Sequence, residues 1–300
     1  MDLHKLRTFR AVVETRSFTG AGEKVLLSQG HVSGHIKDLE ETYGVKLFDR
    51  RGRMVQLTGA GEILDRYAQR LFTLAEEAER ALDEYKGVLS GELVTGASTT
   101  PGTYLMPPLL GLFRERYPQI GLDLVIGNSR EIQERVRAGE MELAVIGQVP
   151  ALEGLDSRPL VDDEIILIAS PRHPLASRPA IAPAELGEYE FIMREEGSGT
   201  RQAALDALEA SGVKVRPMME LGSNPAVARA VTANLGLSFL SKFAVEAEMA
   251  LGQIVALNIT GLKITRHFSL IWNSGHWLSP AARKFMEIIE EQYDRGRLPV

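Results

Sequence analysis

The amino-acid sequence predicts an α/β protein with two folded parts joined by one long helix. Three patterns lead to this prediction. The first sixty residues carry apolar side chains at helical spacing and then a short hairpin pattern. Residues 59–89 carry a heptad repeat, and from residue 91 onward short apolar runs alternate with helical segments of about ten residues. Such alternation predicts βαβ units and a parallel sheet covered on both faces.

Length and composition set the outer limits of the prediction. At 300 residues, with 44% hydrophobic and 25% charged residues, the chain is long enough for roughly two domains. No apolar run approaches the roughly 18 residues that a membrane-spanning helix needs, and no signal-peptide pattern follows Met1. The absence of cysteine excludes disulfides and thiolate metal sites. We therefore expect a cytoplasmic protein that contacts no membrane.

Charge is distributed unevenly along the chain. Residues 1–60 contain ten lysines and arginines against seven acidic residues, whereas the remainder contains 24 against 33. This asymmetry indicates a small module that binds a polyanion, attached to an acidic body. Chance clustering would explain the same numbers, so the charge pattern alone does not decide between the two.

Three helices are predicted before the hairpin. Apolar residues at helical spacing predict a helix over residues 3–14, and Ser17 or Thr19 can cap a second short helix that ends near Lys24. Residues 26–30 suit a turn. A third helix then spans residues 30–43, and Gly44 ends it in a position that favours left-handed backbone.

A β-hairpin follows, and Thr58 then caps the long helix. Its signature is the apolar pair Leu47-Phe48, a basic turn that contains Gly52, and an alternating segment up to Leu57. Helix, turn, helix, hairpin and long helix in this order define a winged helix-turn-helix, which binds duplex DNA. Residues 1–58 are therefore predicted to be a DNA-binding domain.

The predicted DNA-reading residues are small or polar, because bulky apolar side chains suit neither base edges nor phosphates. Arginines at the hairpin tip suit phosphate contact or insertion into the minor groove. His31 and His35 also have the spacing of metal ligands, but no cysteine or acidic partner accompanies them, so DNA contact is favoured and no metal is expected. The predicted set is Ser28, Gln29, His31, Ser33, His35 and Lys37 on the third helix, and Arg50, Arg51 and Arg53 at the hairpin.

The long helix carries a seam of apolar residues spaced alternately by four and three positions. A helix over residues 59–89 would be about 45 Å long, which is too long for a small domain to cover. We expect residues 59–90 to form a dimerising linker, with an ordinary amphipathic helix packed on its own domain as the alternative. The seam consists of Leu64, Ala68, Leu71, Ala75, Ala78, Leu82, Tyr85 and Leu89.

The remaining chain alternates between strands and helices. Strands are expected at 93–97, 122–126, 143–146, 165–169, 191–193, 237–240 and 268–272. Helices are expected at 107–116, 129–138, 201–211, 226–234 and 279–293.

The N-terminal run closely resembles the signature of LysR-type transcriptional regulators. The matching parts are "SFT", "LSQ", "VS", "I..LE", "G.KLF.R" and "LT.AGE", and "YP" at Tyr117 and "HPLA" at His173 extend the resemblance over the whole chain. Gly30 and His31 stand where the family usually has Pro and Ala, and Gly34-His35 stand where an Arg usually follows "VS". Glycine within a helix costs about 0.5–1 kcal/mol, so we expect a less rigid module.

The resemblance implies that residues 91–300 form an effector-binding domain with two Rossmann-like lobes, like a periplasmic binding protein. Lobe I would comprise residues 91–161 and 267–300, and lobe II residues 162–266. In such folds ligands bind beyond the carboxyl ends of strands, at helix N-termini. Two loops fit this rule, 97–103 with Pro101 as first helical residue, and 194–201, where Arg201 can supply a full charge if it turns inward.

The expected effector is a small anion or carboxylate, because both loops offer hydroxyls and free amides. They most resemble loops of the branch that senses sulfur or carbon-assimilation metabolites (CysB/CbbR-like). Ordinary helix caps would look similar, but two such loops in facing lobes favour a site. The predicted residues are Ser98, Thr99, Thr100, Thr103, Asn128, Gly147, Gln148, Glu195, Ser198, Gly199, Thr200, Arg201 and Asn224.

The family also implies partners. It implies a homotetramer that binds AT-rich pseudo-palindromic promoter DNA, with RNA polymerase as a further candidate partner and no cofactor beyond the effector. An enzyme is the main rival class. However, the six histidines are scattered, "GSGTR" lacks the spacing of a P-loop, and no Gly-x-Ser-x-Gly elbow occurs. An architectural DNA binder without an effector would not need the 210 residues after position 90.

Overall fold

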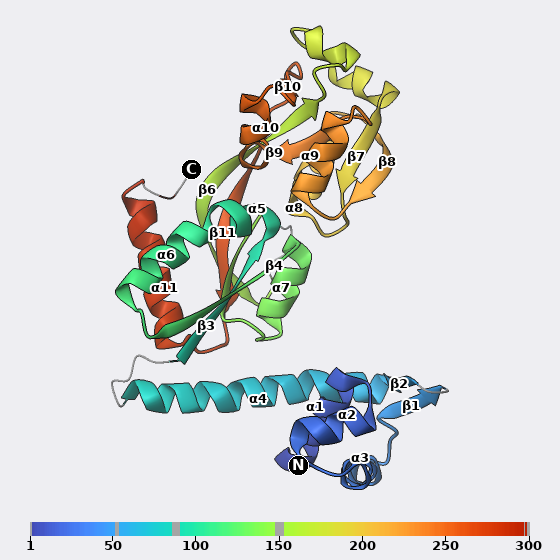
Figure 1. Cartoon of the computed structure of the whole chain (residues 1–300), viewed down its shortest axis with the longest axis vertical. Helices are drawn as coiled ribbons and strands as arrows, with labels where there is room; N and C mark the ends of the chain where they lie inside the picture. The colour runs from blue at the N-terminus through green and yellow to red at the C-terminus, as the bar shows by residue number, and fades with distance from the viewer. Residues whose placement is uncertain (1, 52–53, 86–90, 148–152, 297, 299–300) are drawn as a thin grey trace. The chain divides into compact units, whose positions relative to one another are not determined.

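The computed structural model describes residues 2–51, 54–85, 91–147, 153–296 and 298. The chain divides into two compact units, Met1–Arg80 and Ala81–Val300 (Figure 1). Among the described residues, no helix is long and apolar enough to cross a membrane.

The first unit is a winged helix-turn-helix, as predicted. Helices α1 (Leu3–Thr15), α2 (Phe18–Val25) and α3 (Gln29–Tyr43) precede an antiparallel hairpin of β1 (Phe48–Arg51) and β2 (Met54–Leu57). Their apolar faces meet in one core, which contains the fully buried Leu6, Phe9, Val12 and Val32. Phe9 and Phe48 lie with ring centroids 5.2 Å apart, so the hairpin is fastened to α1.

Side-chain caps define the helix ends in this unit. Ser17, rather than Thr19, caps α2 by accepting a hydrogen bond from the Gly20 amide at 3.2 Å. Ser28 caps α3, which begins at Gln29, one residue before the predicted start. Gly44 ends α3 with a φ of 68°, the left-handed conformation that the sequence predicted.

Helix α4 (Gly59–Tyr85) begins on this unit and turns part of the predicted seam inward. Ala68 is buried in the core of the unit, and Leu64 and Phe72 pack against it. The prediction that every seam residue faces a partner chain is therefore wrong for Leu64 and Ala68. At these two positions the helix packs on its own domain, as the alternative predicted. The exposed apolar row shares Leu71 with the seam but otherwise consists of other positions: Ile63, Tyr67, Leu71 and Leu74 are 52%, 56%, 38% and 60% exposed. Leu82, Tyr85 and Leu89 fall outside the described side chains.

In the second unit, lobe I is built on strands β3 (Gly91–Ser98), β4 (Ile120–Gly127) and β5 (Leu143–Gly147), which pair in parallel. Helices α6 (Met106–Arg116) and α11 (Pro280–Asp294) cover one face (Figure 1). On this face the rings of Phe113 and Phe285 meet edge to face. Helix α7 (Ser129–Arg137) covers the other face through Ile132 and Val136. Short helix α5 (Thr99–Tyr104) follows β3 directly, so Pro101 is its third residue and not its first, as had been expected.

Two long strands connect the lobes. Strand β6 (Leu155–Ala169) and strand β11 (Ile264–Asn273) pair antiparallel, with Asp163 opposite Arg266. The sheet order is β10-β6-β11-β5-β3-β4, with β9 on β6, so the sheet is mixed rather than parallel. The reason is connectivity: the chain enters lobe II along β6 and returns along β11, which forces the two strands to run in opposite directions.

Lobe II has a second, parallel strand pair and two cores. Strand β7 (Glu190–Arg194) pairs with β8 (Arg216–Leu221), while β9 (Ser238–Ser241) and β10 (Val255–Leu257) join β6. Strands β8 and β10 were not predicted, because β8 is exposed along most of its length and β10 has only three residues. The helices are α8 (Gly199–Ala210), α9 (Asn224–Thr232) and α10 (Glu246–Ala250), with 3-10 turns at Pro174–Ser177, Pro183–Glu188 and Lys242–Ala244.

Candidate functional site

Helix α3 carries a polar, low-relief outer face. Gln29, Ser33 and Lys37 follow one another at intervals of four residues, and Gln29 Nε2 lies 3.4 Å from Ser33 Oγ. The Lys37 side chain is 72% exposed. Gly34 lies beside this row, and a Cβ added there would meet no atom within 4 Å. The face therefore offers donors and acceptors with little bulk between them, which suits docking in a major groove.

Three other predicted residues of α3 have partners inside the unit. Ser28 Oγ accepts from the His31 amide at 3.3 Å and lies 2.8 Å from His31 Nδ1. His35 Nδ1 lies 2.9 Å from the Thr8 hydroxyl of α1, so this ring joins α3 to α1. No group of three or more metal-ligand side chains occurs in the described part of the chain.

The hairpin arginines can be placed only through their backbone. Arg50 pairs with Val55 and Arg51 with Met54 across the hairpin. Arg53 lies outside the described residues, as do the side chains of Arg50 and Arg51.

Within the second unit, a small cavity with about 10 Å³ of free volume lies where both lobes contribute residues. It is bounded by the starts of α5, α7 and α8, whose first amides have no carbonyl acceptor within their own helix. The hydroxyl of Thr200 has no hydrogen-bond partner among the described residues. The lining residues are Ser98, Thr99, Thr100, Asn128, Ser129, Arg194, Ser198, Gly199, Thr200 and Arg266.

Arg194 connects the two lobes at this cavity. It ends strand β7, and its residue is 3% exposed. Its Nη2 donates to the Thr99 hydroxyl of lobe I at 3.2 Å, and its Nη1 donates to Asn224 Oδ1. Asn224 in turn donates to the Thr100 hydroxyl at 3.1 Å. A buried cation thus reaches across the cavity with polar groups on both sides.

A second contact between the lobes lies at the rim. Arg130 of α7 pairs with Glu196 at 2.9 Å, and its amide donates to the Gly197 carbonyl at 3.2 Å. Gly197 has a φ of 89°, and a Cβ there would lie 2.7 Å from Asn128 Oδ1. Glycine at this position therefore permits the close approach of the two lobes.

A buried ion pair holds the second arginine of the cavity. Arg266 Nε donates to Asp163 Oδ2 at 2.7 Å, and the Ser241 hydroxyl donates to Asp163 Oδ1 at 2.6 Å. The side chains are 2% and 0% exposed. Burial raises the pKa of Asp163 and lowers the pKa of Arg266, while the attraction between the two charges opposes both shifts. The pair fixes one positive charge at the strands that join the lobes.

The structure brings seven predicted effector residues to the cavity: Ser98, Thr99, Thr100, Asn128, Ser198, Gly199 and Thr200. Asn224 lies behind them and binds Arg194, and Gly147 packs on Arg266, where a Cβ would lie 2.8 Å from Nη1. Thr103 does not line the cavity, because its hydroxyl donates to the Thr99 carbonyl within α5. Gln148 lies outside the described residues.

Arg201 was predicted to contribute a charge if it turned into the cleft, and it does not turn there. Its guanidinium donates to the Arg194 carbonyl at 3.0 Å and pairs with Glu220 of β8, away from the cavity. Glu195 also does not line the cavity, since its carboxylate is bound to Arg194.

The charges that the cavity does contain are Arg194 and Arg266, which sequence reasoning missed. A usable signal existed, because charged residues within or at the end of buried strands need a partner. Arg194 ends "EFIMR", while Asp163 and Arg266 interrupt the apolar pattern of β6 and β11.

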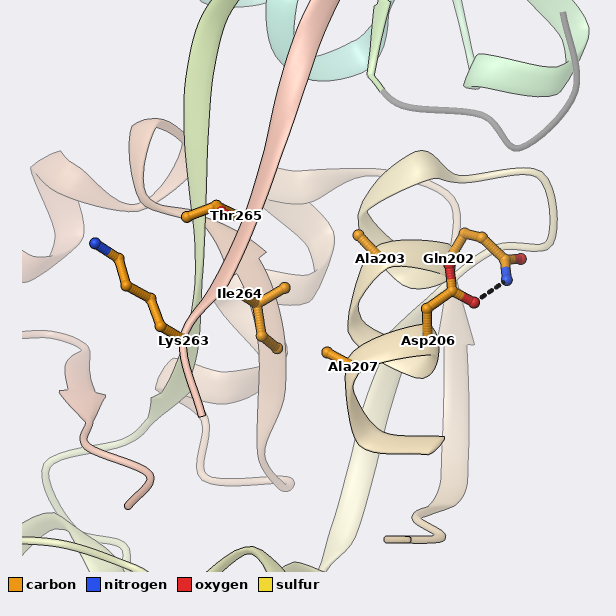
Figure 2. A pocket seen from close by; sticks show the side chains of 7 residues that line it. All are labelled: Gln202, Ala203, Asp206, Ala207, Lys263, Ile264 and Thr265. Atoms are coloured by element: carbon orange, nitrogen blue, oxygen red, sulfur yellow. Dashed lines mark hydrogen bonds between the residues drawn. The ribbon is translucent and has the colours of Figure 1, made fainter. Parts of the chain in front are cut away.

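A larger groove of about 360 Å³ lies elsewhere on lobe II, between α8 and the start of β11. Figure 2 shows Gln202 and Asp206 hydrogen-bonded to each other on α8, across from Lys263 and Ile264. Its lining contains one lysine and one carboxylate among neutral side chains. The smaller cavity is the stronger candidate site, because buried charges and facing helix starts converge there.

Comparison with known proteins places both units in one family. Residues 3–62 match the model of the bacterial regulatory helix-turn-helix protein, lysR family. Residues 86–294 match the LysR substrate binding domain.

Curated relatives match along nearly the whole chain. A probable RuBisCO transcriptional regulator of Cyanidium caldarium is 38% identical, over 94% of this chain and 91% of the relative. The HTH-type transcriptional regulator CysL of Bacillus subtilis is 35% identical, over 89% of each chain. Among solved structures, the Synechocystis PCC6803 CcmR regulatory domain in complex with 2-PG is 32% identical, with a TM-score of 0.63, covering 68% of this chain and 98% of that domain.

Proposed function

The chain belongs to the LysR family of DNA-binding transcription regulators, which are not enzymes, and we propose that it couples promoter binding to a small anion held between the lobes of its effector-binding domain. The observation that carries the proposal is the cavity where Arg194 and Arg266 meet the hydroxyls of both lobes. We further propose that the protein acts in the cytoplasm, on promoters used by RNA polymerase.

We propose that the N-terminal half of α3 reads bases in the major groove. Gln29 and Ser33 supply short neutral donors and acceptors on its exposed face, and Lys37 supplies a charge for phosphate. Residues 1–60 carry only a small positive excess. Tight binding therefore needs a second copy, which favours pseudo-palindromic sites with one half-site for each copy.

Two separate surfaces support self-association. One is the exposed row of α4 with Ile63, Tyr67 and Leu74. The other is formed by strands at the edges of their sheets, with Ile126 of β4 and Met218 of β8 at 48% and 43% exposure. Two distinct surfaces are what a dimer of dimers requires.

Light scattering of variants at several concentrations tests this assembly. Tyr67→Lys is expected to break the dimer formed through α4. Met218→Lys is expected to leave dimers that no longer form tetramers. A wild-type chain that stays monomeric at micromolar concentration would overturn the proposal.

We propose that the effector is a small oxyanion or carboxylate with more than one negative charge. Two guanidiniums line the cavity together with the starts of α7 and α8, so it offers positive charge and hydrogen-bond donors to an anion such as a short phosphorylated or sulfur-containing acid. The ligand of the solved relative, 2-PG, supports this class.

Thermal unfolding of the full chain with 2-PG, sulfite, sulfate and phosphate tests the effector site. At least one of these anions is expected to raise the Tm and to change promoter affinity. Thr200→Val keeps the side-chain shape and removes a hydroxyl from the cavity, so the effect should weaken. Thr265→Val is the matched control, because Thr265 lines the open groove of Figure 2 instead. If no anion stabilises the protein, the proposal fails.

A further inference from the structure

The guanidinium of Arg194 already holds a carboxylate that belongs to the chain. Nε lies 2.8 Å from Glu195 Oε2, and Nη2 lies 2.9 Å from Glu195 Oε1, so the contact is bidentate. The Arg194 side chain is 2% exposed, whereas that of Glu195 is 22% exposed. The Glu195 carboxylate thus occupies N–H donors of Arg194 that an incoming anion could otherwise bind.

Counting donors shows what an incoming anion would meet. A guanidinium has five N–H groups. The Nε and Nη2 edge faces Glu195, while the Nη1 and Nη2 edge binds Asn224 and Thr99. Both edges that could bind an oxyanion bidentately are therefore in use.

The two edges differ in what their release would break. Freeing the Nη1 and Nη2 edge would remove the contact to Thr99 of lobe I and the contact to Asn224, which itself binds Thr100 of lobe I. Freeing the Nε and Nη2 edge would break only a contact between neighbours on one loop of lobe II. Glu195 reaches solvent, so its carboxylate can be hydrated once released.

We propose that Glu195 is a built-in competitor of the effector, and that an anion binds Arg194 by displacing this carboxylate. The proposal rests on the anion site proposed above. It assigns Glu195 a role in specificity. A monocarboxylate would replace one carboxylate with another and gain little, whereas a phosphate or sulfate group carries more charge and binds a guanidinium more strongly. Glu195 thus sets a threshold that favours multiply charged anions.

Arg266 does not offer the same exchange. Its partner Asp163 is 0% exposed and is also held by the Ser241 hydroxyl at 2.6 Å. Displacing Asp163 would strand a charge in the interior, which is strongly unfavourable. Only Glu195, among the two carboxylates that pair with arginines of the cavity, is free to leave.

Calorimetric titration of the full chain with 2-PG, sulfate and acetate tests the proposal in the variant Glu195→Gln. Glutamine keeps the shape and removes the charge, so 2-PG and sulfate are expected to bind at least about tenfold more tightly, the size of one charge-assisted hydrogen bond. The preference for these anions over acetate should shrink. Glu195→Ala, which leaves no group on Arg194, should act in the same direction and serves if the glutamine variant folds poorly.

Glu196→Gln is the matched control. Its side chain is 77% exposed, it pairs with Arg130, and the substitution changes the net charge equally. No comparable tightening is expected. If Glu195→Gln leaves anion affinity unchanged or weakens it, or if Glu196→Gln tightens binding equally, the competitor role is overturned. A wild-type protein and variants that bind none of the three anions would instead overturn the anion site itself.

Discussion

The outer face of α3 and the cavity between the lobes are assembled in opposite ways. Gln29, Ser33 and Lys37 come from one helix, with Gln29 and Lys37 exposed and Ser33 half-buried, so each side chain is placed by the helix alone. The cavity draws on segments far apart in sequence, and its charges are buried in hydrogen-bonded networks. A change on α3 should therefore alter recognition with little effect on folding, whereas a change in the cavity network should affect both.

Asp163→Asn is expected to have the largest effect. It leaves the Arg266 guanidinium buried without its counter-ion, which typically costs about 3–5 kcal/mol of unfolding free energy. Urea denaturation of the full chain, followed by Trp272 and Trp277 fluorescence, measures the loss in the second unit. Asp162→Asn is the control, because this neighbour is 80% exposed and its loss should cost less than about 0.5 kcal/mol. Equal effects of the two variants would remove the contrast between the cavity and α3.

Gln29→Ala should have an intermediate effect, confined to DNA. Losing a base contact costs about 1–3 kcal/mol of specific binding free energy. The free energy of unfolding should change by less than about 0.5 kcal/mol, because the side chain is exposed. Fluorescence anisotropy with a native promoter fragment and a scrambled duplex separates specific from general affinity. An unchanged footprint and affinity would mean that another face of α3 reads the bases.

This contrast also explains how much the sequence could reveal. Ser28, Gly44 and the hydroxyl loops near Ser98 and Ser198 were predictable, because caps and strand-to-helix turns are local patterns. Their predicted roles in binding DNA or an effector stay predictions.

The charges of the cavity were not predictable in the same way. Arg266 meets Asp163 across 103 positions of sequence, and Arg194 meets Thr99 across 95. Arg201 was misplaced for a related reason. Its partner Glu220 lies on β8, a strand whose exposed side chains give no alternating pattern. Knowing which arginine faces the cavity requires knowing which strand lies beside it.

Gly34→Ala should have a smaller effect and should separate stability from recognition. The added Cβ would meet no atom within 4 Å, so helix propensity alone predicts a gain of about 0.5–1 kcal/mol in unfolding free energy. Promoter affinity should fall if the low relief of this face matters for docking. Gly22→Ala is the control within the same motif, because its Cβ would lie 2.5 Å from the Leu27 carbonyl and should destabilise the unit. If Gly34→Ala instead lowers the free energy of unfolding, the outer face of α3 contributes to folding as well as to recognition.

The smallest effect concerns a histidine that belongs to neither site. His173 caps a 3-10 turn by accepting the Leu175 amide at 3.2 Å on Nδ1, which requires an unprotonated ring nitrogen, and burial lowers the pKa of His173 below 6.5. The folded state therefore binds a proton less readily than the unfolded state. The resulting stabilisation is complete above pH 6.5 and is lost as pH falls through the lowered pKa. In His173→Gln, the slope of unfolding free energy against pH in this range should be reduced, with little change at pH 8. Because the ring lies in the second unit, the change should appear only in that unit's unfolding transition, and an identical slope in both proteins would exclude His173 as its source.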